Sequence, residues 1–226
     1  MDLLAGAHLA ALAVTAAVAA GAAWAARATP GTWIVPFTRG LALLIIGAYL
    51  VENVVVVARG NWSVERSLPL HLTDAVTIVA AFALWRPRPF AVELAYFWGL
   101  TASLQAVLTP DLDSGIPSLF FWTYFVTHSG AVVAAVFLTW GLGLAPRPGA
   151  VPRVLGATVA FTALAGVGDL LTGGNYMFLR EKPEQASLLD LMGPWPWYIF
   201  GAAVLAVAMF AVLDLPFRRR RARLHG

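Results

Sequence analysis

The 226-residue sequence contains no cysteine and few charged residues. The missing cysteine excludes disulfide bonds, thiolate metal ligands, palmitoylation and a cysteine nucleophile, and it leaves the redox compartment undetermined. Only 12% of the residues are charged, against about 25% in soluble domains, which leaves too little charge to cover a water-facing surface. Lysine occurs once, as Lys182 in a predicted loop. No predicted span therefore offers the Schiff-base amine of a retinal protein.

Long apolar runs fill most of the chain, and 60% of its residues are hydrophobic. The runs are continuous rather than alternating, which favours membrane-spanning helices over barrel strands. A helix needs about 20 apolar residues to cross the hydrocarbon. The runs that qualify are residues 3–26, 38–57, 68–85, 90–108, 118–143, 151–172 and 195–216. The sequence thus predicts an all-α, polytopic bundle of seven transmembrane helices in a single membrane domain, residues 1–217.

Basic residues are distributed unevenly between the two sides of this predicted bundle. Residues 218–226 form a basic tail, and with seven spans most of the other arginines fall on the same side. That side receives eleven of the fifteen Lys and Arg residues, which leaves four on the other: Arg59, Arg66, Arg180 and Lys182. The positive-inside rule then predicts a cytoplasmic C-terminus and an outside N-terminus. The tail is typical of a membrane-surface segment rather than of a nucleic-acid-binding one.

Polar side chains gather near the predicted outer ends of five spans. Intramembrane ionisable groups are costly and indicate function by default. Within residues 68–85, His71 and Asp74 stand three positions apart and are predicted to share a helical face. Such a carboxylate–imidazole pair suits acid–base catalysis, metal ligation or proton relay. His128 lies deeper, about 9–15 Å into its span at 1.5 Å per residue. The structural alternative is that these groups only cap helices or join neighbouring ones.

Six short segments carry a family resemblance. They are LPLHLTD (68–74), ELAYFWG (93–99), QAVLTPD (105–111), FVTHS (125–129), GNYM (174–177) and SLLDLMGPWPWY (187–198). Together they resemble the YwaF-like bacterial integral membrane proteins, which are grouped with the transmembrane protein 164 family. The resemblance covers most of the chain and implies a multi-pass protein of the bacterial inner (plasma) membrane.

The resemblance also implies lipid chemistry. Eukaryotic relatives are described as lipid acyltransferases with a membrane-embedded Cys and His, and distant kin as Thr/His lipid hydrolases. The family's histidines match His71 and His128. The eukaryotic Cys falls on Leu70, and bacterial relatives often carry Cys where this chain has Thr73. The chain therefore departs from the family pattern at the nucleophile, and Thr73 is the remaining hydroxyl candidate.

We therefore predict an intramembrane lipid-acting enzyme that performs acyl transfer or ester hydrolysis. Thr73 is the predicted nucleophile and His128 the base, with His71 and Asp74 completing the catalytic group. The predicted substrate-binding residues are Gln105, Asp169, Asn175, Tyr176, Trp195 and Trp197. No metal or other cofactor is predicted. The predicted partners are membrane lipids and not nucleic acid, and the oligomeric state is left open.

Three alternatives remain at this point. A proton-linked transporter would use Glu52, His71, Asp74, His128 and Asp169 as a relay, although no inverted repeat is visible. A metal-dependent hydrolase would use His71, Asp74, His128 and Asp169 as ligands. A scaffold or receptor with a structural polar core needs no chemistry at all.

Overall fold

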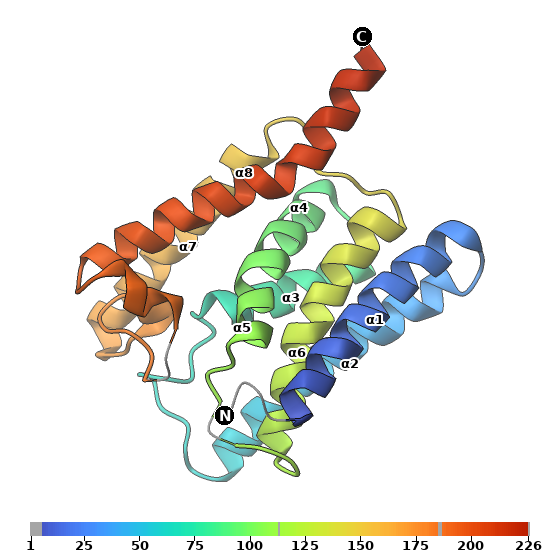
Figure 1. Ribbon diagram of the computed structural model, residues 1–226. Coiled ribbons are helices and arrows are strands. Elements are labelled where there is room, and N and C mark those ends of the chain that lie inside the picture. Colours follow the sequence, from blue (N-terminus) through green and yellow to red (C-terminus); the bar gives the residue numbers. More distant parts are fainter. Residues whose placement is uncertain (1–5, 113, 185–186, 226) are drawn as a thin grey trace. The chain divides into compact units, whose positions relative to one another are not determined.

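The computed structural model describes residues 6–112, 114–184 and 187–225, with side chains through Arg218, and all regular structure in them is helical. The elements in chain order are α1 (Gly6–Ala28), α2 (Ile34–Ala58), α3 (Leu72–Trp85), α4 (Pro89–Trp98), η1 (Gly99–Ser103), α5 (Leu104–Leu108), α6 (Leu119–Val136), η2 (Phe137–Gly141), α7 (Ala150–Thr172), η3 (Tyr176–Phe178), η4 (Leu188–Met192) and α8 (Trp197–His225). Figure 1 shows these helices. The all-α prediction is confirmed.

Six helical stretches are long and apolar enough to cross a membrane. They are Gly6–Ala28, Ile34–Ala58, Pro89–Leu108, Leu119–Gly141, Ala150–Thr172 and Trp197–Arg218. They correspond to six of the seven predicted spans, although residues 3–5 of the first lie outside the described part. The stretches Pro89–Leu108 and Leu119–Gly141 each contain a π-helical turn, η1 and η2. The chain is a multi-pass membrane protein.

The third predicted span is shorter than expected. α3 has 14 residues, or about 21 Å at 1.5 Å per residue, against a hydrocarbon core of about 30 Å. Residues 68–71 are not helical; in this stretch the Leu68 N–H donates to the Tyr176 hydroxyl (3.0 Å) and the Leu70 N–H to the Leu68 carbonyl (2.7 Å). His71 thus precedes the helix. The prediction that His71 and Asp74 share a helical face is wrong for this reason.

The helices pack as two compact units, and the first contains α1 through η2. In it α6 packs against α1, α2, α4 and η1, and Figure 1 shows α6 between the α1–α2 pair and α4. Small residues permit this packing. A Cβ at Gly130 would lie 2.5 Å from Cγ1 of Ile45, and one at Gly99 would lie 3.1 Å from the Ala131 carbonyl oxygen. Glycine lets helix backbones approach closely, as expected for transmembrane interfaces.

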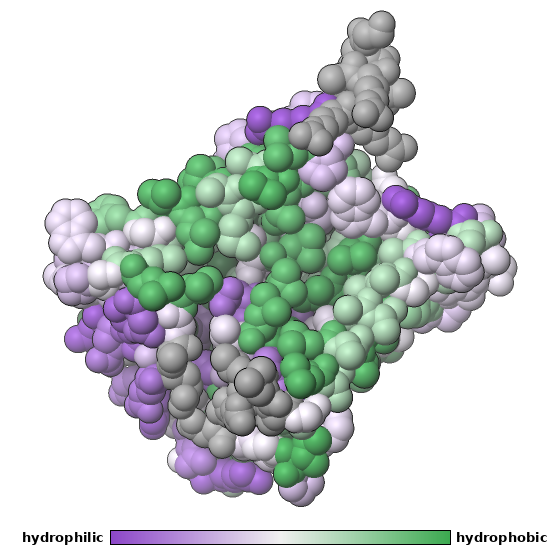
Figure 2. All heavy atoms as spheres, viewed as in Figure 1, coloured by the Kyte–Doolittle hydropathy of each residue, from purple (hydrophilic) through white to green (hydrophobic). Residues whose placement is uncertain are grey.

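The second unit contains the 63–72 segment, α7, α8 and the connection between these two helices. η3 packs on α7 and η4 on α8. A Cβ at Gly174 would lie 2.5 Å from the Glu65 carbonyl oxygen, so a glycine is needed where the 63–72 segment passes the end of α7. Within this unit, Figure 2 shows hydrophobic side chains covering α8 and hydrophilic ones on the loops at its N-terminal end.

The predicted basic tail continues α8 instead of forming a separate element. The helix runs through Pro216 to His225, and Asp214 accepts a hydrogen bond from Nε of Arg218. The side chains of residues 219–226 lie outside the described part. The single-domain prediction for residues 1–217 stays a prediction.

Candidate functional site

His128 is held in a defined orientation on α6. Its Nδ1 lies 2.7 Å from the Tyr124 carbonyl oxygen, one helical turn earlier, and 3.2 Å from Oγ1 of Thr127. A carbonyl oxygen can only accept, so Nδ1 carries the proton and donates it. The ring also stacks on Tyr124, with centroids 4.1 Å apart. Two contacts therefore fix the tautomer and the plane of the imidazole.

The other ring nitrogen of His128 is left as an acceptor. With the proton on Nδ1, Nε2 carries a lone pair. In the described part of the chain His128 makes hydrogen bonds only through Nδ1. The side chain is half-buried, and its Nε2 is not among the buried polar atoms that lack a hydrogen-bond partner. This is the arrangement that a general base requires.

A polar layer surrounds His128 within the first unit. On α6, the Thr123 hydroxyl donates to the Phe120 carbonyl (3.4 Å) and lies within range of the Glu52 carboxyl of α2, and the Tyr124 hydroxyl donates to the Ala106 carbonyl (2.9 Å). Glu52 lies within electrostatic range of Tyr124, and Asp74 within range of Tyr49. The sequence analysis missed Tyr49 and Thr123. The spacing from Tyr49 to Glu52, three residues on one helix, was the available signal for Tyr49.

Thr73 lies in the first turn of α3, in the same unit as His128. Its carbonyl accepts a hydrogen bond from the Thr77 hydroxyl (2.8 Å). No hydrogen bond joins the Thr73 hydroxyl to His128 among the described residues. The predicted nucleophile and base therefore share a unit but are not in hydrogen-bond contact.

Gln105 is engaged locally. Its Nε2 donates to the Thr109 hydroxyl, which in turn donates to the Gln105 carbonyl (3.2 Å). The two residues thus bond to each other at the C-terminal end of α5. This bond uses one of the two N–H donors of the Gln105 amide, and the role of Gln105 in substrate binding stays a prediction.

A second group of predicted residues meets in the second unit, around Tyr176. The buried Asp169 carboxylate accepts from the Tyr176 N–H through Oδ1 (2.6 Å). The Tyr176 hydroxyl donates to the Val64 carbonyl (2.6 Å) and accepts from Leu68, while the Met177 N–H donates to Nδ1 of His71 (3.3 Å). These bonds tie the 63–72 segment to the end of α7.

His71 and Asp169 are electrostatic neighbours in this second unit. Burial lowers the pKa of the His71 imidazole, and the Asp169 carboxylate opposes that shift. Oδ2 of Asp169 is buried and accepts no hydrogen bond from the described residues. The sequence analysis placed both residues in one layer but did not identify Tyr176 as the group that organises them.

Asn175 and the tryptophans have structural contacts. Asn175 accepts from the N–H groups of Arg180 and Glu181 (3.0 and 3.2 Å) and so holds the loop after α7. Trp195 donates from Nε1 to the Leu179 carbonyl (3.1 Å). Trp195 and Trp197 are 62% and 65% exposed, as expected for rings of an interfacial aromatic belt.

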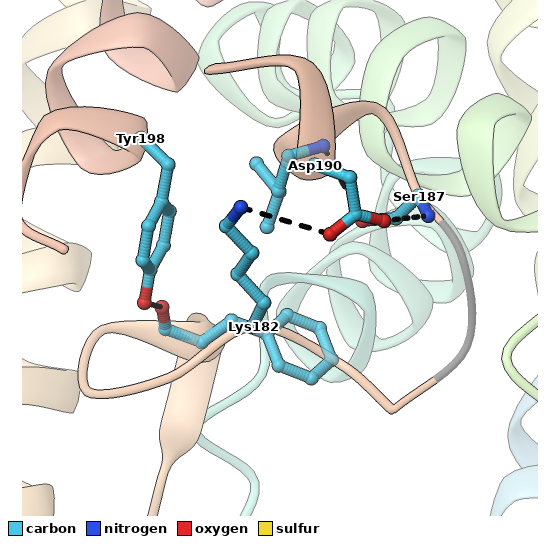
Figure 3. Close-up of polar contacts among 6 residues, drawn as sticks. Lys182, Ser187, Asp190 and Tyr198 are labelled. Atoms are coloured by element: carbon cyan, nitrogen blue, oxygen red, sulfur yellow. Dashed lines mark hydrogen bonds and ion pairs between the residues drawn. The ribbon is translucent and has the colours of Figure 1, made fainter. Parts of the chain in front are cut away.

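The loop before α8 carries an ion pair, shown in Figure 3. Nζ of Lys182 lies 3.7 Å from Oδ1 of Asp190 and 5.7 Å from the Tyr198 ring centroid. Asp190 also accepts from the Ser187 N–H (2.8 Å) as part of a capping box on η4. These contacts order the loop and offer no reactive group.

Comparison with known protein families decides the family. Residues 3–214 match the TMEM164 family. The chain belongs to the TMEM164 family. The resemblance seen in the six sequence segments is thereby confirmed. No curated protein and no solved structure matches the chain.

Metal ligation in this TMEM164-family chain would require donor side chains that converge on one point. Within residues 6–112, 114–184 and 187–225, no three His, Cys, Asp or Glu side chains come together as metal ligands would. The four ligands of the metal-hydrolase alternative, His71, Asp74, His128 and Asp169, are thus not gathered into one centre.

Proposed function

We propose that this TMEM164-family protein is an intramembrane enzyme that acts on lipids, by acyl transfer or ester hydrolysis. The observation that carries the proposal is the His128 imidazole, anchored through Nδ1 to the Tyr124 carbonyl while Nε2 keeps an accessible lone pair. A neutral, oriented imidazole in a membrane span is costly to maintain without a role.

The proposed reaction starts with proton transfer to His128. Nε2 accepts the proton of an attacking hydroxyl, whose oxygen forms a bond to the ester carbonyl carbon of a lipid. The ester C–O bond breaks, and the imidazolium returns the proton to the leaving alkoxide. The attacking hydroxyl is Thr73 in a two-step acyl transfer, or water in direct hydrolysis. Among the described residues Thr73 is not hydrogen-bonded to His128, a contact that direct hydrolysis by water does not need.

The surrounding side chains have proposed supporting roles. Tyr124 positions the imidazole by stacking and by its carbonyl. Glu52 and Asp74 supply negative charge that stabilises an imidazolium in a poorly solvated layer. In the second unit, His71, Asp169 and Tyr176 hold the 63–72 segment, which leads directly into Thr73. Trp195 and Trp197 are exposed rings that contact lipid.

We also propose the placement of the protein in its membrane. Six spanning stretches and exposed apolar side chains support membrane lipids as its partners. The positive charge bias supports a bacterial plasma membrane protein with the N-terminus outside and the C-terminus in the cytoplasm. The His128 layer would then serve the outer leaflet.

Lipidomics on cells that express matched variants tests the proposal. Wild type is compared with His128→Ala, Thr73→Ala and a control, His8→Ala. His8 is also a buried histidine on a span, and its Nε2 is within hydrogen-bond distance of the Val107 carbonyl (2.8 Å). We expect His128→Ala to abolish the lipid change that wild type produces, while His8→Ala keeps it. Identical lipid profiles for wild type and His128→Ala at equal expression would refute the enzyme. Loss of the lipid change in Thr73→Ala would indicate acyl transfer through Thr73, and its retention would indicate direct hydrolysis.

A further inference from the structure

Arg39 places a guanidinium inside a membrane span without a protein counter-ion among the described residues. It is the sixth residue of α2, about 7.5 Å along the helix from Ile34 at 1.5 Å per residue. Its guanidinium lies over the Trp85 ring of α3, 3.8 Å from the centroid. The Nη1 atom is buried and has no hydrogen-bond partner in the described part of the chain. The stacked indole is thus the contact that holds this cation.

An uncompensated cation at this depth requires an anion. Guanidinium N–H groups that lose water without gaining an acceptor are costly in a membrane, and stacking on an indole recovers only part of that cost. Residues 34–45 and 82–92 contain no Asp or Glu; the first carboxylate after α3 is Glu93 of α4, and no ion pair joins a carboxylate to Arg39 among the described residues. Residues 82–92 contain two further arginines, Arg86 and Arg88, both exposed.

The same end of the first unit has the features of a headgroup region. Just before α2, the Trp33 ring lies 6.1 Å from the ring of Phe137, the first residue of η2. A Cβ at Gly141 would lie 3.2 Å from Cα of Ala23, so the last turns of α1 also lie here, close to Arg27. Tryptophan and arginine at a helix end are typical of the membrane–water interface, at the level of the lipid phosphates.

We propose that Arg39 binds a phosphate-bearing anion, namely the phosphodiester of an anionic phospholipid in the adjoining leaflet. The planar guanidinium presents parallel N–H groups that match two phosphate oxygens, and Trp85 holds the plane of the guanidinium fixed. The lipid's acyl chains lie along the exposed apolar face of the spans. Arg86 and Arg88 raise the local concentration of anionic lipid without forming the site. This proposal does not depend on the enzyme proposal.

Native mass spectrometry of the detergent-solubilised full chain tests the site. The protein is titrated with phosphatidylglycerol or phosphatidylcholine, and the affinity for the first bound lipid is measured for each variant. Arg39→Gln should weaken the first phosphatidylglycerol about tenfold, the value of one charge-assisted hydrogen bond. Arg86→Gln and Arg88→Gln, the matched exposed controls, should change it less than about twofold, as expected of surface charge.

Two further variants separate binding from folding. Arg39→Lys keeps the charge but loses the planar pair of donors, and Trp85→Leu keeps Arg39 but removes the stacked ring. Both should weaken the first phosphatidylglycerol, and unchanged binding in both overturns the proposal even if Arg39→Gln does not fold.

Three other results overturn the lipid assignment. One is phosphatidylcholine binding to wild type as tightly as phosphatidylglycerol. Another is Arg86→Gln losing as much affinity as Arg39→Gln, which would indicate general surface attraction. The third is inorganic phosphate displacing the bound lipid, which would make the free anion the ligand.

Discussion

Replacing Tyr176 by Phe should release the 63–72 segment from the end of α7. Tyr176 is fully buried, and its hydroxyl makes two hydrogen bonds, to the Val64 carbonyl (2.6 Å) and from the Leu68 N–H (3.0 Å). Phenylalanine keeps the ring and removes both bonds. Val64 is exposed, so its carbonyl can bond to water, whereas the half-buried Leu68 N–H is left without an acceptor.

The magnitude follows from that one N–H. A buried donor without a partner costs about 1–3 kcal/mol. This cost should lower the free energy of local opening of the segment by the same amount. The population of the open form, and any labelling rate proportional to it, should rise roughly 5- to 150-fold.

Cysteine labelling can measure this opening, because the chain has no cysteine of its own that would react. A single Ser67→Cys substitution introduces the chain's only thiol in this segment, at a half-buried position. The rate at which a maleimide labels this thiol is compared between Ser67→Cys alone and Ser67→Cys combined with Tyr176→Phe. Tyr198→Phe is the matched control, because it removes a buried hydroxyl that donates to the Phe178 carbonyl (2.6 Å) and not to the segment.

The outcome distinguishes a specific tie from general loosening. Equal labelling rates with and without Tyr176→Phe would refute the inference that these two bonds hold the segment. A similar acceleration in Tyr198→Phe would also count against it, because the whole unit would then be loosened.

Two further predictions concern packing and topology. Gly130→Ala places a Cβ 2.5 Å from Cγ1 of the fully buried Ile45, so it should lower the free energy of unfolding by about 1–2 kcal/mol. Gly47→Ala, with no atom within 4 Å of the added Cβ, should not lower it, and equal Tm values for the two variants would contradict the reasoning. For topology, single cysteines at exposed Asn61 and Arg88 flank α3. If α3 crosses, an impermeant maleimide should label Asn61→Cys on intact cells and Arg88→Cys only after permeabilisation; labelling of both on intact cells would show that α3 does not cross.

The predicted spans agree with the structure where they depend only on the length of a continuous apolar run. Six of them follow from the length of apolar runs, because the thickness of the hydrocarbon sets how many helical residues are needed. The third was too long by four residues. The non-helical residues before its start at Leu72 contact Tyr176, whose hydroxyl accepts from the N–H of Leu68, 108 positions away. A run of apolar residues cannot report a bond to a distant hydroxyl.

In the candidate site, too, the sequence indicated contacts within one helix but not contacts between helices. The sequence singled out His128 by its depth, and its anchoring to Tyr124 is a contact within one helical turn. The proximity of Glu52 on α2 to Thr123 on α6 involves two helices and could not be read from spacing. Thr73 and His128 were predicted to lie in one layer, but sharing a layer does not determine which side chains touch, and no hydrogen bond joins them among the described residues.

By itself the sequence determined the solvent, the secondary structure and the family of this protein. Scarce charge and long apolar runs require lipid, and lipid requires helices because the backbone must satisfy its own hydrogen bonds. The tertiary structure decided the tautomer of His128, the tie between Tyr176 and the 63–72 segment, and the stacked cation at Arg39. These depend on which donor meets which acceptor across helices. That choice depends on differences of a few tenths of an ångström in how side chains pack, and the linear pattern of residues does not encode these differences.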